Sequence, residues 1–146
     1  SDSVYSSTSV AAIGVACHEA GHAAQYAQSY APIKIRNLVL PVANLGSRAG
    51  IPLAIIGFFL NFEILAIAGI VFFSFAVLFQ LITLPVEFNA SKRALAVITD
   101  ADILSENEKV GAKKVLTAAA MTYVAALAVS IANLLRILLM FNRRRK

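Results

Sequence analysis

Long apolar runs separated by short polar segments dominate the chain. The runs at residues 64–84 and 115–135 contain no charged residue, and each matches the roughly 20 residues that a helix needs to cross a hydrocarbon core of about 30 Å. A third apolar stretch follows Arg48, whose charge would be costly in the middle of a span. We therefore expect membrane spans at residues 49–62, 64–84 and 115–141, with an amphipathic or kinked entry segment up to about Arg48.

A shorter helical pattern precedes these runs. Residues 9–29 contain no proline, are rich in alanine, and begin at serine and threonine side chains that can cap a helix. Pro32 breaks this helix, because the residue before a proline is pushed out of the α region. Gly14 and Gly21 share one face of the helix, which suggests close packing against a neighbour. After the second span, residues 86–114 are rich in charges and predict an interfacial section.

These elements predict an all-α fold, a polytopic membrane helical bundle in which residues 1–146 form a single domain and the 9–29 helix lies at or near the interface. The composition agrees, since 59% hydrophobic and 14% charged residues contrast with about 45–50% and 25% in soluble domains. The net charge of +5 does not indicate nucleic acid, because the basic residues form no patch interleaved with aromatics and residues 143–146 are the usual basic flank of a span. The single cysteine, Cys17, excludes an internal disulfide.

The candidate chemistry lies in the sequence His18-Glu19-Ala20-Gly21-His22. Residues four apart share a helix face, so both imidazoles can bind one metal ion. Zinc accepts imidazole nitrogen and keeps one position for water in catalytic sites, and in this motif the intervening glutamate is the general base. His18 and His22 are the only histidines, and unpaired polar groups in an apolar helix would cost a few kcal/mol each. We therefore predict one zinc ion per chain, with Glu19 activating its water; two exposed or core histidines without a metal are the alternative.

A third ligand must come from an acidic residue or Cys17, because a catalytic zinc normally has three protein ligands. Cys17 lies about 100° around the helix from its neighbour, and we expect it to pack as a small apolar residue. Two spans separate His22 from Glu87, which therefore returns to the side of the first helix, among apolar residues where a carboxylate requires a partner. Glu63 lies in the turn on the opposite side, so Glu87 is the predicted third ligand. The remaining acidic residues are expected on a solvated face: Asp100, Asp102, Glu106 and Glu108.

The sequence around these positions resembles the YugP-like membrane zinc metallopeptidases of bacteria. The resemblance rests on two blocks, VACHEAGHA at 15–23 and LPVEFNASKRA at 84–94, and on Tyr30-Ala31-Pro32 between them. It covers essentially the whole chain. Family members are longer at the N-terminus, so the chain resembles their C-terminal two-thirds.

The resemblance implies a zinc peptidase of the gluzincin type, in which a glutamate downstream of the paired histidines completes the metal site. It carries over onto His18, His22 and Glu87 as ligands and Glu19 as base. Many membrane peptidases with two spans between the histidines and the glutamate have an aspartate four residues after that glutamate. That position is Ser91 here, so the resemblance does not supply a carboxylate there.

Four further residues are candidates for supporting roles. Asn89, Ser91 and Arg93 could orient Glu87 or the ligating histidines. Arg93 could also stabilise an oxyanion, with contact to lipid headgroups as the alternative. Tyr26, one turn after the second histidine, could donate to an oxyanion, although we expect it to pack in the core.

The predicted function is that of a membrane-embedded zinc-dependent endopeptidase, multi-pass in the bacterial inner membrane among lipids, acting on a membrane-protein or peptide substrate. The lysines and arginines on the side of the site favour a cytoplasmic active site, while the basic tail argues for the opposite orientation. One alternative is a non-proteolytic scaffold in which zinc only pins two helices together. Another is a metal transporter, which would need polar residues along the spans. These residues are few and scattered: Ser74, Gln80, Thr122, Ser130 and Asn133.

Overall fold

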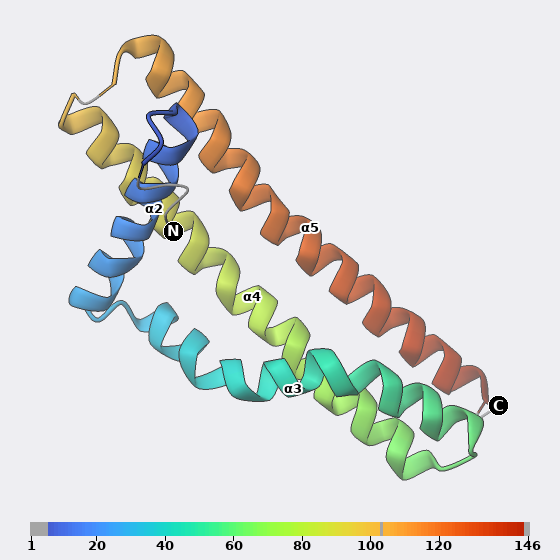
Figure 1. The fold of residues 1–146 in the computed structure, drawn as a ribbon. Helices are drawn as coiled ribbons and strands as arrows, with labels where there is room; N and C mark the ends of the chain where they lie inside the picture. The colour runs from blue at the N-terminus through green and yellow to red at the C-terminus, as the bar shows by residue number, and fades with distance from the viewer. Residues whose placement is uncertain (1–5, 103, 145–146) are drawn as a thin grey trace. The chain divides into compact units, whose positions relative to one another are not determined.

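The protein is all-helical, as the sequence predicts. The computed structural model describes residues 6–102 and 104–144, and these contain no strand. Its helices, shown in Figure 1, are α2 (Val10–Ala27), α3 (Ala31–Phe59), α4 (Glu63–Asp100) and α5 (Glu106–Arg144). The last three are long and apolar enough to cross a membrane, with mean hydropathies of 1.4, 2.5 and 2.2.

Short turns with one left-handed residue end three of these helices. Ser29, Asn61 and Asp102 have φ values of 53°, 56° and 49°, which is the backbone conformation of the residue after a helix C-cap. After α3, the Phe62 N–H donates to the Gly57 carbonyl at 2.9 Å, closing the wider hydrogen-bonded ring of a Schellman motif. These turns connect successive helices without a long loop.

Side chains cap the starts of α2 and α5. Ser9 Oγ accepts a hydrogen bond from the Ala12 N–H at 3.2 Å, as expected for a serine preceding an alanine-rich helix. Before α5, the Ser105 N–H and Oγ both donate to Glu108 Oε2, at 2.9 and 2.6 Å. This serine–glutamate pair satisfies one backbone donor at the helix start.

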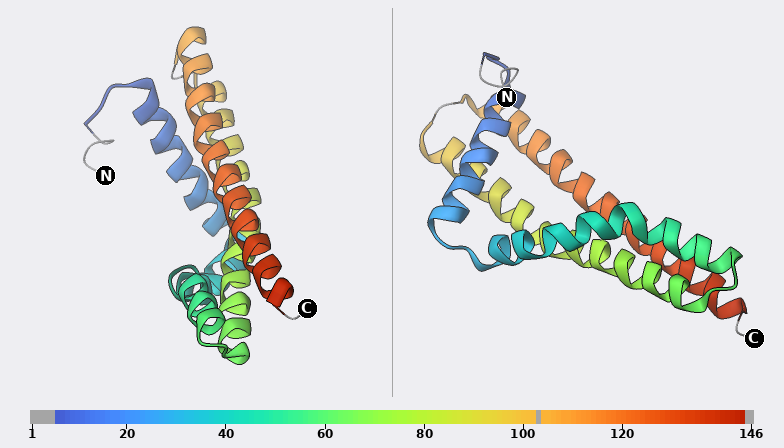
Figure 2. Two further views of the ribbon diagram at one scale, coloured as in Figure 1. Left: turned by 90° about the vertical axis from the view of Figure 1, so that its right-hand side faces the viewer. Right: turned by 60° about the horizontal axis from the view of Figure 1, so that its bottom comes forward.

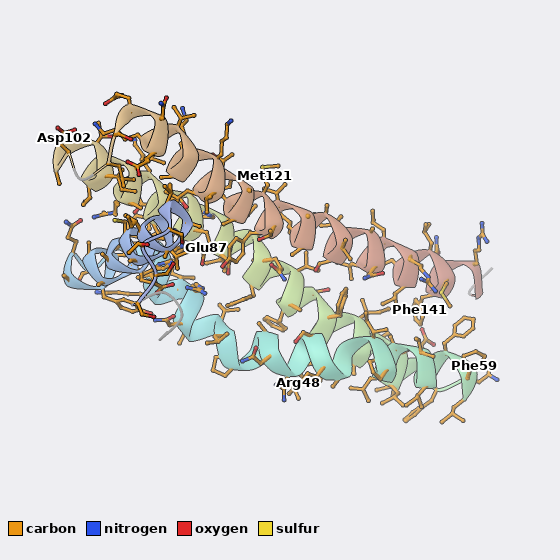
Figure 3. The ribbon with its side chains drawn as sticks, turned by 45° about the horizontal axis from the view of Figure 1, so that its top comes forward. Arg48, Phe59, Glu87, Asp102, Met121 and Phe141 are labelled. Atoms are coloured by element: carbon orange, nitrogen blue, oxygen red, sulfur yellow. The ribbon has the colours of Figure 1, made fainter. Side chains whose placement is uncertain are left out.

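The prolines interrupt the helices less than the sequence suggested. Pro41 and Pro52 lie inside α3, so one helix replaces the predicted entry segment and separate span. Pro85 likewise lies inside α4, and this helix continues to Asp100. A proline removes one backbone donor, and local adjustment can satisfy the freed carbonyl in apolar helices. Arg48 is exposed on α3, as Figure 3 shows.

The predicted interfacial section at 86–114 is largely helical. Its first half continues α4 to Asp100, and α5 begins at Glu106, so this helix contains charged residues ahead of the predicted span at 115–141. The connection between α4 and α5 is therefore short.

The chain divides into two compact units. The first contains the residues up to Ile33 together with Leu84–Tyr123, and the second contains Lys34–Thr83 together with the residues from Val124. In the second unit α3 runs beside the first half of α4, and glycines allow their backbones to meet (Figure 2). A Cβ at Gly50 would lie 2.8 Å from the Phe73 nitrogen, and Cβ atoms at Gly46, Gly57 and Gly69 would also collide with the facing helix. Such small residues are typical of helix contacts in membranes.

The first unit packs α2 against the second half of α4 and the beginning of α5. Its apolar core is a cluster contributed by α4, α5 and the connection between them: Ala94, Ile98, Leu104, Ala112 and Leu116. Cys17 packs against this cluster, which confirms its predicted apolar role, and burial raises the pKa of its thiol. Beyond the cluster, α2 and α4 come into close contact at Gly21 and Ala90.

Candidate metal centre

Three predicted ligand side chains converge where α2 meets α4 in the first unit. His18 Nε2 lies 3.1 Å from Glu87 Oε2, and His22 Nε2 lies 3.5 Å from the same oxygen. One ligand atom from each of the three residues lies within 4.8 Å of the other two. The imidazoles are nearly perpendicular, with ring centroids 4.7 Å apart. Figure 3 shows Glu87 on α4, where that helix passes α2.

Helical periodicity brings these residues together. His18 and His22 are one turn apart on α2, and the buried positions of α4 next to Glu87 recur at Val86, Ala90 and Ala94. The backbones can approach because Gly21 has no side chain: a Cβ there would lie 2.7 Å from the Ala90 carbonyl oxygen. The glycine of the His-Glu-Ala-Gly-His sequence therefore lets the carboxylate of α4 reach both rings.

The donor set and its spacing fit a zinc ion. Two imidazole nitrogens and a carboxylate oxygen are ordinary zinc ligands, at about 2.0–2.2 Å from the metal in a tetrahedral arrangement. That geometry places ligand atoms roughly 3.3 Å from one another. The observed separations of 3.1 and 3.5 Å lie on either side of this value. The three residues could therefore hold a metal ion with little rearrangement.

Burial makes a positive partner for Glu87 necessary. The Glu87 side chain is only 2% exposed, while those of His18 and His22 are 16% and 15% exposed. A carboxylate taken out of water is costly unless it is paired or bound to a metal. His18 Nε2 lies within ordinary hydrogen-bonding distance of Glu87 Oε2, whereas His22 Nε2 lies beyond that distance. A cation between the three residues would compensate this buried charge.

Each imidazole is also held at its second nitrogen. His18 Nδ1 lies 3.1 Å from Ser91 Oγ, and His22 Nδ1 lies 3.0 Å from Gln25 Oε1. Both rings therefore turn Nε2 toward Glu87 and Nδ1 toward a polar side chain. Metal-ligating histidines usually have such a partner, which fixes the ring orientation. Ser91, four residues after Glu87, thus contacts the first histidine.

The other predicted residues lie around this cluster at varying distances. Glu19 is exposed on α2 directly after His18. Asn89 and Arg93 are linked, since Arg93 Nε donates to Asn89 Oδ1 at 2.8 Å. Tyr26 is 56% exposed, so the expectation that it packs in the core is wrong: its position on α2 turns the ring away from the buried face.

The sequence analysis missed Gln25, which is fully buried. Its amide joins His22 to α4 through the Val86 carbonyl and Asn89. The signal was present in the sequence, because Gln25 is a polar residue three positions after His22 in an otherwise apolar helix. Such a side chain lies beside the second histidine and requires hydrogen-bond partners.

The remaining acidic residues form the solvated surface that was predicted. The four side chains are exposed: Asp100, Asp102, Glu106 and Glu108. Lys109 Nζ donates to Asp102 Oδ1 and Glu106 Oε1, both at 2.8 Å. The hydrogen bond and charge of Lys109 hold the pKa of the Asp102 carboxyl below its ordinary value. These charges stabilise the turn between α4 and α5.

Comparison with known proteins decides the family. The family described as "Putative neutral zinc metallopeptidase" matches residues 1–142. The chain belongs to this family. It is also 48% identical over 141 residues, or 97% of its length, to the "Putative membrane protease YugP" of Bacillus subtilis (strain 168), of which the match covers 63%. No solved structure is significantly similar.

The comparisons agree with the geometry of the site. The family description names zinc, and the described part of the chain contains a group of two histidines and a glutamate that could hold a metal ion. The relative's name places a protease in a membrane, and this chain has three helices of sufficient length and hydropathy. The chain spans less than two-thirds of the length of that relative.

Proposed function

We propose that this chain carries the metal centre of a membrane-embedded zinc-dependent endopeptidase. The observation that supports this most strongly is the convergence of His18, His22 and Glu87 around a position with the donors and spacing of a zinc site. One zinc ion per chain, bound by these three residues, leaves the fourth coordination position for water or substrate. This arrangement is that of a catalytic site, whereas structural zinc sites have four protein ligands.

In the proposed peptide hydrolysis, the zinc ion and the side chains of the protein have different roles. Bound zinc would polarise the peptide carbonyl and make a water molecule acidic enough to lose a proton at neutral pH. Glu19 is the general base: its carboxylate follows His18 directly and is exposed, so it can accept the proton of the attacking water and deliver it to the leaving amine. Glu87 is a ligand and takes no part in proton transfer.

Supporting roles fall to the polar residues near the ligands. Ser91 orients the His18 ring through Nδ1. Arg93 and Tyr26 are candidates for donors to the oxyanion of the tetrahedral intermediate. Tyr26 is 56% exposed on α2, and Arg93 lies on α4, where it donates to Asn89.

The environment of the enzyme is proposed to be the bacterial inner membrane, with several passes and the site on the cytoplasmic side. Only 6% of the most apolar window of α5 is buried, and lipid would cover such a surface. A substrate would then be a membrane protein or a peptide at the bilayer surface. The orientation is supported by basic residues that the topology predicted from the sequence assigns to the side of the site: Lys34, Arg36, Lys92, Arg93, Lys109, Lys113 and Lys114.

A cleavage assay with matched glutamate variants tests this proposal. Purified protein in detergent, loaded with zinc, is incubated with a broad peptide library, and cleavage is followed by mass spectrometry. Glu19→Gln should retain zinc and lose cleavage by at least about 100-fold, the lower range for a general base. Glu106→Gln, which alters an exposed glutamate paired with Lys109, should cleave normally.

The same assay separates the proteolytic from the scaffold function. Cleavage by Glu19→Gln at the rate of the unaltered protein would contradict the assigned base. Zinc binding without cleavage by the unaltered protein would favour a scaffold, in which the metal only joins α2 to α4.

A further inference from the structure

Gln25 makes polar contacts with three groups, although its side chain is fully buried. Its Oε1 lies 3.0 Å from His22 Nδ1. Its Nε2 donates to the Val86 carbonyl at 2.8 Å and to Asn89 Oδ1 at 3.0 Å. These contacts use both ends of the amide, so its orientation can be worked out from the partners.

The Val86 carbonyl fixes which end of the amide faces α4. A backbone carbonyl only accepts hydrogen bonds, so the atom of Gln25 that lies 2.8 Å from it must be the nitrogen. Rotating the amide by 180° would place two oxygens against each other in a buried site, which forfeits the hydrogen bond and leaves both acceptors unsatisfied. The oxygen of Gln25 is therefore directed at His22.

Arg93 fixes the same orientation a second time. A guanidinium only donates, so the atom of Asn89 that lies 2.8 Å from Arg93 Nε is the oxygen Oδ1. That oxygen also faces Gln25, which must again present its nitrogen. Two oxygens that accept hydrogen bonds, the Val86 carbonyl and Asn89 Oδ1, thus orient the Gln25 amide.

The orientation of the Gln25 amide determines which ring nitrogen of neutral His22 carries the proton. Since Gln25 Oε1 can only accept, the neutral ring must carry its proton on Nδ1 to make the 3.0 Å hydrogen bond. Its Nε2 then has a free lone pair, which is the form that binds a metal. Glu87 does not compete for the proton, because its oxygen lies 3.5 Å from Nε2, beyond the usual hydrogen-bond range.

We propose that the Arg93–Asn89–Gln25 relay is a positioning device that selects the metal-binding tautomer of His22 before any metal arrives. This inference rests on the proposed metal site and adds the residues that prepare it. His18 has no equivalent device, because its Nδ1 faces Ser91, and a hydroxyl can donate as well as accept. The hydrogen bond at Nδ1 therefore selects one tautomer of His22 but does not select one of His18.

The tautomer can be observed directly in the metal-free protein. The chain has only two histidines, so labelling histidine with nitrogen-15 and recording long-range proton–nitrogen spectra gives four ring nitrogens. His22→Gln assigns the two signals of His22. At a pH where both rings are neutral, His22 should show a protonated Nδ1 and an unprotonated Nε2.

Variants of the relay provide the control experiments. Gln25→Met removes the acceptor at similar volume and should shift His22 to the Nε2–H form. Asn89→Leu should lower the Nδ1–H population, while Asn89→Asp keeps the acceptor and should preserve it. Gln28→Leu removes the other hydrogen bond of Arg93, at 2.7 Å, and should leave the tautomer unchanged.

Zinc affinity gives a second measurement. Competition with a chromogenic chelator should show that Gln25→Met binds zinc about 10–100-fold more weakly, as for other partners of metal-ligating histidines. An Nε2–H form of His22 in the unaltered protein would overturn the proposal. An Nδ1–H form of His22 in Gln25→Met, unchanged from the unaltered protein, would also overturn it. The tautomer is read without metal or substrate, so a failure of the peptidase function would not mimic either result.

Discussion

Gly21→Ala tests whether the contact between α2 and α4 sets the geometry of the metal centre. The added methyl would lie 2.7 Å from the Ala90 carbonyl oxygen and 3.2 and 3.3 Å from its Cα and carbonyl carbon. All three atoms belong to the backbone, so no side chain can rotate away. Restoring ordinary contact requires the helices to separate by about 0.7 Å.

The effect on metal binding should exceed the effect on stability. Overpacking costs about 1–3 kcal/mol, and alanine regains roughly 1 kcal/mol of helix propensity over glycine, so the net loss of stability is about 0–2 kcal/mol. A metal site, however, tolerates displacements of only about 0.2 Å. Because His18 and His22 flank Gly21 while Glu87 lies on α4, the separation pulls ligands apart, and zinc affinity should fall by more than about tenfold.

Gly14→Ala is the matched control on the same helix. A Cβ at Gly14 would lie 3.9 Å from Leu116 Cγ, which is an ordinary contact, so this variant should gain up to about 1 kcal/mol of stability and bind zinc normally. Chelator competition gives the affinities, and thermal unfolding in detergent gives the stabilities. Equal zinc affinity in the two variants would refute the reasoning.

Three further predictions concern other contacts. Ser91→Ala removes the partner of His18 Nδ1 and should weaken zinc binding at least about tenfold in chelator competition; unchanged affinity would mean that the hydroxyl does not orient the ring. Gly50→Ala would place a Cβ within 2.9 Å of α4 and should destabilise the second unit by up to about 2 kcal/mol in thermal unfolding, after the gain in helix propensity is subtracted from the overpacking cost; a raised melting temperature would contradict this packing. Asp102 has a lowered pKa because of Lys109, so its contribution to stability is present above the unfolded pKa and is lost as the pH falls through the folded pKa. Lys109→Gln should raise the Asp102 pKa in a carboxyl NMR titration, and an unchanged value would exclude the ion pair.

Much of the site was predictable because helical periodicity acts over short distances. The spacing of His18 and His22 required only one helix. Glu87 followed from counting two apolar runs and from the cost of an unpaired carboxylate among apolar residues. The structure brings these three residues together.

Features that depend on packing between helices were not predictable. The local sequence did not predict that α3 and α4 continue through their prolines, because a proline ordinarily ends or kinks a helix. Tyr26 lies one turn from His22, yet its side chain is exposed. Gln25 could be recognised from the sequence as a polar residue in an otherwise apolar helix. Its role could not be predicted, because it depends on a hydrogen bond to the backbone carbonyl of Val86, a group that every residue has.

The measurement that tests the central claim most directly is the zinc content of purified protein, determined by mass spectrometry for the unaltered chain, Glu19→Gln and Glu87→Ala. The account predicts one zinc ion per chain in the first two and none in Glu87→Ala, because His18 and His22 alone leave the site with two ligands. Full zinc occupancy in Glu87→Ala would show that the metal is held elsewhere or by another carboxylate, and would contradict the account.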